Sequence, residues 1–198
     1  MTGVTRRAGS AGAPGSEGSA DPEGPAGAAG LEGPAGSAAS GGAEGPAAEP
    51  DLVVLVGLQA AGKSTFYAQV LADRYELVSK DLFPRGARNK QVRQMRLVAE
   101  HLSAGRAVAV DNTNPSPQEW GPLVKAAHAH GATATAYWFP PDVAGSLRRN
   151  AEREGRDRVP DVGVLATLKR LRRPSEADGF DAVHEVRFDG RGGFEVRP

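Results

Sequence analysis

The chain has no cysteine and few aromatic residues, and both shortages restrict its chemistry. Without cysteine it can form neither a disulfide nor a thiolate metal site, which fits a reducing compartment such as the cytoplasm. It contains two Trp, three Tyr and six Phe, so few side chains can stack against the rings of a ligand. No stretch of sequence is long and apolar enough to span a membrane, and we expect no membrane partner.

The formal net charge is zero, but this average combines two unlike parts. Residues 1–49 are mostly Gly, Ala, Pro and Ser, hold half of the 26 glycines, and carry two arginines against six acidic residues. Such a composition cannot bury enough apolar surface to offset the entropy of ordering, so we expect a disordered tail. Residues 50–198 carry 22 basic and 18 acidic residues and are numerous enough for one domain with its own core.

The tail has a glycine at every third position from 9 to 18 and again from 24 to 36. Gly-X-Y is the collagen pattern. The run is short, is interrupted at Asp21 and contains four prolines. We therefore favour a flexible low-complexity linker over a collagen-like triple helix.

A glycine-rich loop with the pattern GxxxxGK[ST] follows the apolar β-branched run at residues 52–56 and leads into a helical pattern. A strand, this loop and a helix in that order form a phosphate-binding loop. The nine residues expected to bind nucleotide are Gly57, Leu58, Gln59, Ala60, Ala61, Gly62, Lys63, Ser64 and Thr65. The pattern predicts that the chain binds a nucleoside triphosphate.

Each part of the loop has a chemical purpose. Gly57 and Gly62 let backbone N–H groups turn towards phosphate oxygens without a Cβ in the way, and the helix N-terminus adds partial positive charge. Lys63 is expected to reach the β- and γ-phosphates. The Ser64 hydroxyl is expected to bind Mg²⁺.

Strand and helix patterns alternate after the loop. The strand patterns fall at residues 76–79, 107–110, 133–139 and 181–188, and the helical patterns at 63–73, 88–104, 116–130, 142–154 and 161–172. Ser116 and Glu119 resemble a capping box at the start of the third helix. The alternation predicts an α/β fold with a parallel sheet flanked by helices, ligands at the carboxyl ends of its strands, and a small hairpin at residues 189–197.

Three polar clusters follow predicted strands or helices and are candidates for the site. Asp81, in Ser79-Lys80-Asp81, could accept a proton as a general base, or could be a turn or cap residue. The run Asp111-Asn112-Thr113-Asn114-Pro115 lies where phosphate-loop proteins hold metal or substrate, although all five residue types also favour turns. Arg149 and Arg153 belong to an arginine-rich segment that could stabilise a migrating phosphoryl group, or could be a solvated helix face.

Together these motifs resemble the 5′-kinase domain of the polynucleotide kinase family, phosphate-loop kinases that phosphorylate 5′-hydroxyl ends of DNA or RNA. The resemblance runs from about Leu52 to Phe188. It rests on GLQAAGKSTF, on Ser79-Lys80-Asp81, on Asp111-Asn112-Thr113-Asn114-Pro115, and on the RNxxR lid pattern that starts at Arg149. Lys80 stands where the family usually has arginine, and no DxDxT phosphatase motif occurs.

The resemblance implies a role for each matched residue and an AAA-type ATP-binding domain that uses ATP and Mg²⁺. Asp81 would take the proton from the 5′-hydroxyl, while Lys63, Arg149 and Arg153 would stabilise the transferring phosphoryl group. The residues implied to bind the acceptor are Arg85, Asp111, Asn112 and Asn114. Nucleic-acid 5′ ends would be the partners, and a lone kinase domain of this kind could serve a partner repair enzyme.

Two other functions fit the same motifs. One is a phosphate-loop kinase of a small hydroxyl metabolite or a nucleotide-sugar, which the fold alone does not distinguish. The other is a nucleotide-binding module without transfer activity. The segment Asn89-Lys90-Gln91-Val92 lacks the aspartate of the NKxD motif, which argues against a GTPase switch.

Overall fold

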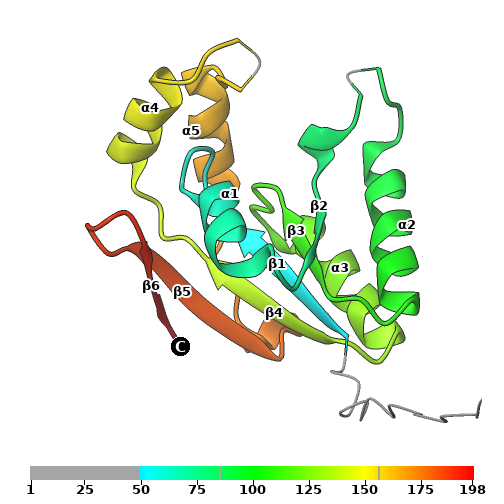
Figure 1. Ribbon diagram of the computed structural model, residues 1–198. Helices are drawn as coiled ribbons and strands as arrows, with labels where there is room; N and C mark the ends of the chain where they lie inside the picture. The colour runs from blue at the N-terminus through cyan, green and yellow to red at the C-terminus, as the bar shows by residue number, and fades with distance from the viewer. Residues whose placement is uncertain (1–49, 85, 156) are drawn as a thin grey trace, which may run out of the picture. The chain divides into compact units, whose positions relative to one another are not determined.

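The computed structural model describes residues 50–84, 86–155 and 157–198 (Figure 1). The tail predicted for residues 1–49 lies outside the described residues, as does the candidate acceptor residue Arg85. Six strands form one sheet in the order β2-β3-β1-β4-β5-β6. They are β1 (Asp51–Val56), β2 (Glu76–Val78), β3 (Val108–Asp111), β4 (Thr133–Trp138), β5 (Ala182–Phe188) and β6 (Phe194–Arg197). β1 to β5 are mutually parallel and β6 is antiparallel to β5, so the α/β fold and the C-terminal hairpin are confirmed.

The helices occur where the sequence patterns predict them, and most are a few residues shorter. They are α1 (Lys63–Phe66), α2 (Lys90–Ser103), α3 (Pro117–Ala129), α4 (Val143–Ala151) and α5 (Asp161–Arg170), with a π-helical turn η1 (Tyr67–Leu71) and the 3₁₀ turns η2 (Lys80–Leu82) and η3 (Glu176–Asp178). The helix after the loop is therefore one α-helical turn that continues as a π-helical one. None of the helices in the described residues is long and apolar enough to cross a membrane.

The start of α3 differs from its prediction in one detail. The helix begins after Ser116, but the expected capping box does not form. The Ser116 hydroxyl donates a hydrogen bond to the Glu119 carboxylate instead of accepting one from the helix backbone. That carboxylate also accepts from Arg170, 3.0 Å away at the end of α5. Glu119 therefore joins the first turn of α3 to α5.

The central strand β1 is buried on both faces, which explains its uninterrupted apolar sequence. Leu52, Val54 and Val56 pack in a core with α2 and α3 on one face of the sheet. Val53 and Leu55 pack on the opposite face with α1, η1, α4 and α5. Figure 1 shows α2 and α4 on either side of the loop that leads into α1. The carboxyl end of β1 therefore opens between the two helical layers.

Several of the chain's few aromatic side chains pack together around Phe66 of α1. Phe66 of α1 lies 5.0–5.6 Å, centroid to centroid, from Tyr137, Phe139 and Phe194, and Phe194 stacks on Phe188 at 5.1 Å. We call these five residues the aromatic cluster. Such rings bury large areas and prefer edge-to-face or offset contacts at these distances. Phe188 and Phe194 come from β5 and β6. The C-terminal hairpin therefore packs against α1, the helix that follows the phosphate loop.

Candidate active site

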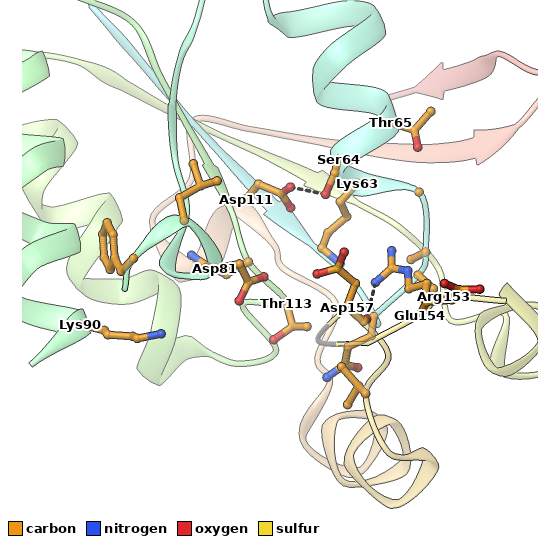
Figure 2. Close-up of a pocket in the computed structure, with 18 of the residues that line it drawn as sticks. Lys63, Ser64, Thr65, Asp81, Lys90, Asp111, Thr113, Arg153, Glu154 and Asp157 are labelled. Carbon is orange, nitrogen blue, oxygen red and sulfur yellow. Dashed lines mark hydrogen bonds between the residues drawn. The ribbon is translucent and has the colours of Figure 1, made fainter. Parts of the chain in front are cut away.

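A cavity of about 800 Å³ opens at the carboxyl ends of β1, β2 and β3 (Figure 2). Its walls come from the phosphate loop, from η2, from the end of β3 and from the segment between α4 and α5. The lining residues used below are Gln59, Ala60, Ala61, Gly62, Lys63, Ser64, Thr65, Asp81, Phe83, Lys90, Asp111, Asn112, Thr113, Arg153 and Asp157. Ligands of parallel α/β sheets bind at this end of the strands.

The phosphate loop has the backbone geometry that its glycines predict. Gly62 has φ of +99°, and a Cβ at this position would lie 2.6 Å from the Phe188 ring, so only glycine fits. The N–H of Gly57 donates to the Thr113 carbonyl at 3.0 Å, which ties the start of the loop to the segment after β3. Seven of the nine predicted loop residues line the cavity, whereas Gly57 and Leu58 are buried behind it.

Lys63 begins α1 and is almost completely buried. Its Nζ donates to the carbonyl oxygens of Leu58 at 2.6 Å and Gly57 at 3.2 Å. Burial lowers the pKa of Lys63 from 10.5 to about 8, against the opposing effect of Asp111, and Arg153 lowers it further. The buried ammonium is therefore only partly compensated by neighbouring negative charge. A phosphate bound on the loop would supply the missing charge and stabilise the protonated lysine.

Ser64 and Asp111 form the second feature of the loop side. The Ser64 hydroxyl donates to Asp111 Oδ2 at 2.5 Å. Burial raises the pKa of Asp111, and the Ser64 hydrogen bond and the Lys63 charge oppose that rise. A hydroxyl oxygen and a carboxylate oxygen side by side on a cavity wall suit Mg²⁺, which takes one or two protein oxygens and completes its shell with water and phosphate. The position of Asp111 after a strand allows a role at the metal or at the substrate, and the resemblance implies the acceptor; its carboxylate lies beside Ser64 of the nucleotide loop.

Asp81 faces the cavity from the opposite wall. It lies in η2, whose start is capped by the Ser79 hydroxyl accepting from the Asp81 N–H at 3.3 Å. The carboxylate is exposed, and its charge raises the pKa values of both Lys63 and Asp111. Figure 2 shows Asp81 and Lys63 lining the same space from different segments. The structure therefore brings an exposed carboxylate into the cavity that the phosphate loop lines.

The two asparagines after β3 have different surroundings. Asn112 lines the cavity, and its Oδ1 accepts from the Lys80 N–H at 3.0 Å. Asn114 is buried, has φ of +40°, and donates to the Leu55 and Val110 carbonyls at 2.9 and 3.4 Å. Its side-chain amide therefore provides a hydrogen-bond donor for backbone carbonyl groups near the ends of β1 and β3. Asn114, an acceptor residue by sequence, does not reach the cavity.

The two lid arginines also separate. Arg153 lines the cavity, and its Nη1 donates to the Asp157 carbonyl at 3.4 Å. Arg149 lies behind the loop, where its Nε donates to the Ala60 carbonyl at 2.8 Å and its guanidinium stands 5.1 Å from the Phe188 ring centroid. α4 ends at Ala151, between the two residues, so they do not share a helix face. Arg149 supports the loop, while Arg153 faces the ligand space.

Some residues of the site carry no motif that sequence reasoning could use. Gln94 of α2 is fully buried and accepts from Asn112 Nδ2 at 2.8 Å. Thr167 of α5 accepts from the loop residue Gln59 at 2.9 Å. Gln94 did leave a signal, because it shares the buried face of α2 with Val98 and Leu102, four and eight residues on. A polar residue on an apolar helix stripe requires a buried partner.

The fold and the loop together define a phosphate-loop kinase domain that binds nucleotide. A parallel sheet, a GxxxxGKS loop entering a helix, and an aspartate that ends the neighbouring strand β3 beside the loop serine are its defining features. The family follows from the sequence itself. Residues 52–176 match the model of the AAA domain family, and the chain belongs to that family.

Several solved structures share this fold at low sequence identity. A fungal RNA kinase is 15% identical, with a TM-score of 0.54 over 71% of this chain, and the chain spans 38% of that protein's length. A sugar kinase from Janibacter sp. is 17% identical, with a TM-score of 0.51 over 69% of this chain and 85% of that one. Kti12 from Chaetomium thermophilum, in complex with ADP-AlF3, is 16% identical, with a TM-score of 0.52 over 70% and 89%.

Proposed function

We propose that this chain is an ATP-dependent kinase that transfers the γ-phosphoryl group to the 5′-hydroxyl end of a polynucleotide. The observation that carries the proposal is that the phosphate loop and the Asp81 carboxylate line the same cavity. A donor phosphate on the loop and an acceptor hydroxyl at Asp81 would then meet in that space. Phosphoryl transfer depends mainly on such positioning and on charge stabilisation.

On the donor side, the loop N–H groups and Lys63 hold the β- and γ-phosphates. Ser64 and Asp111 are the residues that would hold Mg²⁺. Bound there, the ion would neutralise charge on the phosphate oxygens. Arg153 adds positive charge from the segment between α4 and α5, where it lines the same cavity. Binding of the triphosphate replaces the carbonyl contacts of Lys63 with charged ones.

On the acceptor side, Asp81 takes the proton of the attacking hydroxyl. The new O–P bond forms as the bond between the γ-phosphorus and the bridging oxygen breaks, and ADP leaves with the electron pair. Lys63 and Arg153 stabilise the charge that spreads over the transferring group. Asp81 is exposed, so its carboxylate is accessible to an incoming hydroxyl.

A second, basic groove, separate from the cavity, favours a polynucleotide. This groove of about 750 Å³ runs between the first turn of α3, which starts beside Ser116, and the C-terminal end of α5. Its basic residues are Lys169, Arg170, Arg172 and Arg173. Arg170 and Arg173 pair with acidic side chains, whereas Lys169 and Arg172 form no ion pair within the described part of the chain. Phosphodiester groups beyond the first nucleotide would complement this charge.

The decisive experiment is a screen of acceptors. The protein is incubated with Mg²⁺, labelled ATP and 5′-hydroxyl oligonucleotides of DNA and RNA, with the same oligonucleotides carrying a 5′-phosphate as the matched control. A panel of sugars and nucleosides runs in parallel. We expect label on the 5′-hydroxyl oligonucleotides alone. Label found only in small molecules would overturn the polynucleotide assignment.

The groove can be tested in the same assay. Replacing Lys169 and Arg172 together with alanine should raise the KM for a ten-nucleotide acceptor and leave that for a dinucleotide unchanged. Lys125→Ala, an exposed position of α3 outside the groove, serves as the control. An equal effect on both acceptor lengths would argue against a groove for the strand.

A small hydroxyl metabolite is the second candidate. Among the described residues, Phe83 is the single aromatic side chain that lines the cavity, and it is 9% exposed. The Arg93 guanidinium already lies 4.8 Å from the centre of its ring. Grooves for single-stranded nucleic acid usually offer aromatic rings on which bases stack. The scarcity of accessible aromatic rings in this cavity therefore favours a sugar-like acceptor. The metabolite panel of the screen distinguishes the two candidates.

A further inference from the structure

Gln94 lies between the core of the protein and the proposed general base. It belongs to the buried face of α2, is fully inaccessible to solvent, and accepts a hydrogen bond from Asn112 Nδ2 at 2.8 Å. Asn112 in turn accepts from the Lys80 N–H at 3.0 Å. Lys80 directly precedes Asp81 in the short turn η2. A continuous chain of hydrogen bonds therefore connects the helix to the turn that carries the carboxylate.

The other half of the Gln94 amide has no such partner. Its Nε2 donor is buried and makes no hydrogen bond to any described residue. A buried donor without a partner costs stability, whereas an apolar side chain of similar length in this stripe would not. Stability of the core therefore does not account for a glutamine here. Its contact with Asn112 does, because without the Gln94 carbonyl the Asn112 amide could rotate away from Lys80.

Two neighbouring contacts show that α2 as a whole supports this segment. Lys90 Nζ donates to the Lys80 carbonyl at 3.3 Å, and Arg93 lies over the Phe83 ring. Lys90 is partly exposed and Arg93 is exposed, whereas Gln94 is fully buried. The rotation of Asn112, and with it the direction of the η2 N–H groups, depends on the inner contact.

We infer that Gln94 is a positioning residue for Asp81, acting through Asn112 on the turn η2. The inference rests on the proposed role of Asp81 as general base, and it holds for either class of acceptor. Gln94 touches no ligand space, since the cavity lining does not include it. Its contribution is to keep the carboxylate within reach of the attacking hydroxyl, which is a matter of small displacements.

The test uses Gln94→Met, which keeps the length of the side chain and removes both polar atoms. With whichever acceptor the wild-type protein phosphorylates, we expect kcat to fall by about tenfold or more and the KM for ATP to stay unchanged. The temperature of unfolding should remain equal or rise. Gln91→Met, on the exposed side of the same helix, is the matched control and should leave all three quantities unaltered.

A double-mutant cycle with Asp81→Asn separates positioning from structure. If Gln94 acts through Asp81, then Gln94→Met should cause no further loss in single-turnover rate once the carboxylate has been removed. An unchanged kcat in Gln94→Met, or an equal loss with and without Asp81, would overturn the inference. An unchanged rate in Asp81→Asn alone would instead overturn the proposed general base, so the two failures are distinguishable.

Discussion

Arg149 donates a hydrogen bond from its Nε to the carbonyl oxygen of Ala60, 2.8 Å away and 89 residues earlier in the chain. Ala60 has φ of +56°, a region that alanine rarely occupies. The same guanidinium lies over Phe188 and 3.5 Å from Asp142, with the side chain 28% exposed. Arg149 thus holds the phosphate loop in a strained shape from behind.

This relationship predicts different kinetics for the two lid arginines. A hydrogen bond from a charged donor contributes about 1.5–3 kcal/mol, so Arg149→Ala should raise the KM for ATP roughly tenfold and lower kcat less. Arg153→Ala, which removes charge from the cavity itself, should mainly lower kcat. Steady-state kinetics over a range of ATP concentrations measures both, with the exposed Arg148→Ala as control. The same pattern for both variants would contradict separate roles.

Asp81→Asn should abolish transfer and preserve nucleotide binding. General-base catalysis contributes about 100-fold to 10,000-fold, and asparagine cannot accept the proton. ATP affinity, measured by calorimetry, should stay close to that of the wild-type protein because Asp81 lies across the cavity from the loop. Asp73→Asn, an exposed aspartate outside this cavity, provides the control. Unaltered turnover would remove Asp81 from the mechanism.

The lowered pKa of Lys63 predicts that ATP binding weakens in alkaline solution. The free protein loses this charge as the pH rises through about 8. A bound triphosphate favours the charged lysine, so binding takes up a proton above that pH and affinity should fall by up to about tenfold per pH unit. Calorimetry in buffers of different ionisation enthalpy measures the proton uptake. Lys63→Met should bind weakly and show no such step.

The same shift has a consequence for stability with the opposite sign. The unfolded chain keeps the Lys63 proton up to a pH near 10.5, whereas the folded chain releases it near 8. The unfolded state therefore binds more protons between these values, and the contribution of Lys63 to the free energy of unfolding should rise with pH there. Comparing wild-type protein with Lys63→Met in denaturant titrations isolates this contribution. A contribution that falls with pH would contradict the burial of the charge.

Asn114→Ala should reduce stability and leave the acceptor KM alone. The variant leaves the carbonyl ends of β1 and β3 without their buried donor, which costs about 1–3 kcal/mol of unfolding free energy. Asn89→Ala is a useful control, because Asn89 has φ of +55° but makes no side-chain capping bond at its exposed position. The difference between the two variants isolates the amide contacts. If the Asn114→Ala variant is stable but has a raised KM for the acceptor, Asn114 takes part in acceptor binding and the structural role alone is contradicted.

The features that the sequence predicted correctly are those that local rules specify. The loop pattern lies within nine residues, and the alternation of strands and helices requires a parallel sheet. The contact between Ser64 and Asp111 was not predicted, although the parallel pairing of β1 and β3 sets Leu55 beside Asp111 at their carboxyl ends.

The remaining features depend on packing between distant segments. A helix continued to residue 154 would place Arg149 and Arg153 on one face, four residues apart, but α4 ends at Ala151 and separates them. Asn114 turns inward because its left-handed backbone directs the amide at two strand ends. Neither the end of α4 nor this rotation has a pattern in the sequence, because tertiary contacts decide both.

The C-terminal hairpin matters to anyone who wishes to trim this protein. The family match ends at residue 176, yet Phe188 and Phe194 lie beyond it and press against Gly62 of the loop. A fragment cut at the family boundary would keep every residue of the GxxxxGKS motif and lose the wall that shapes it. The shortest piece expected to hold a nucleotide therefore extends through Arg197, the last residue of β6.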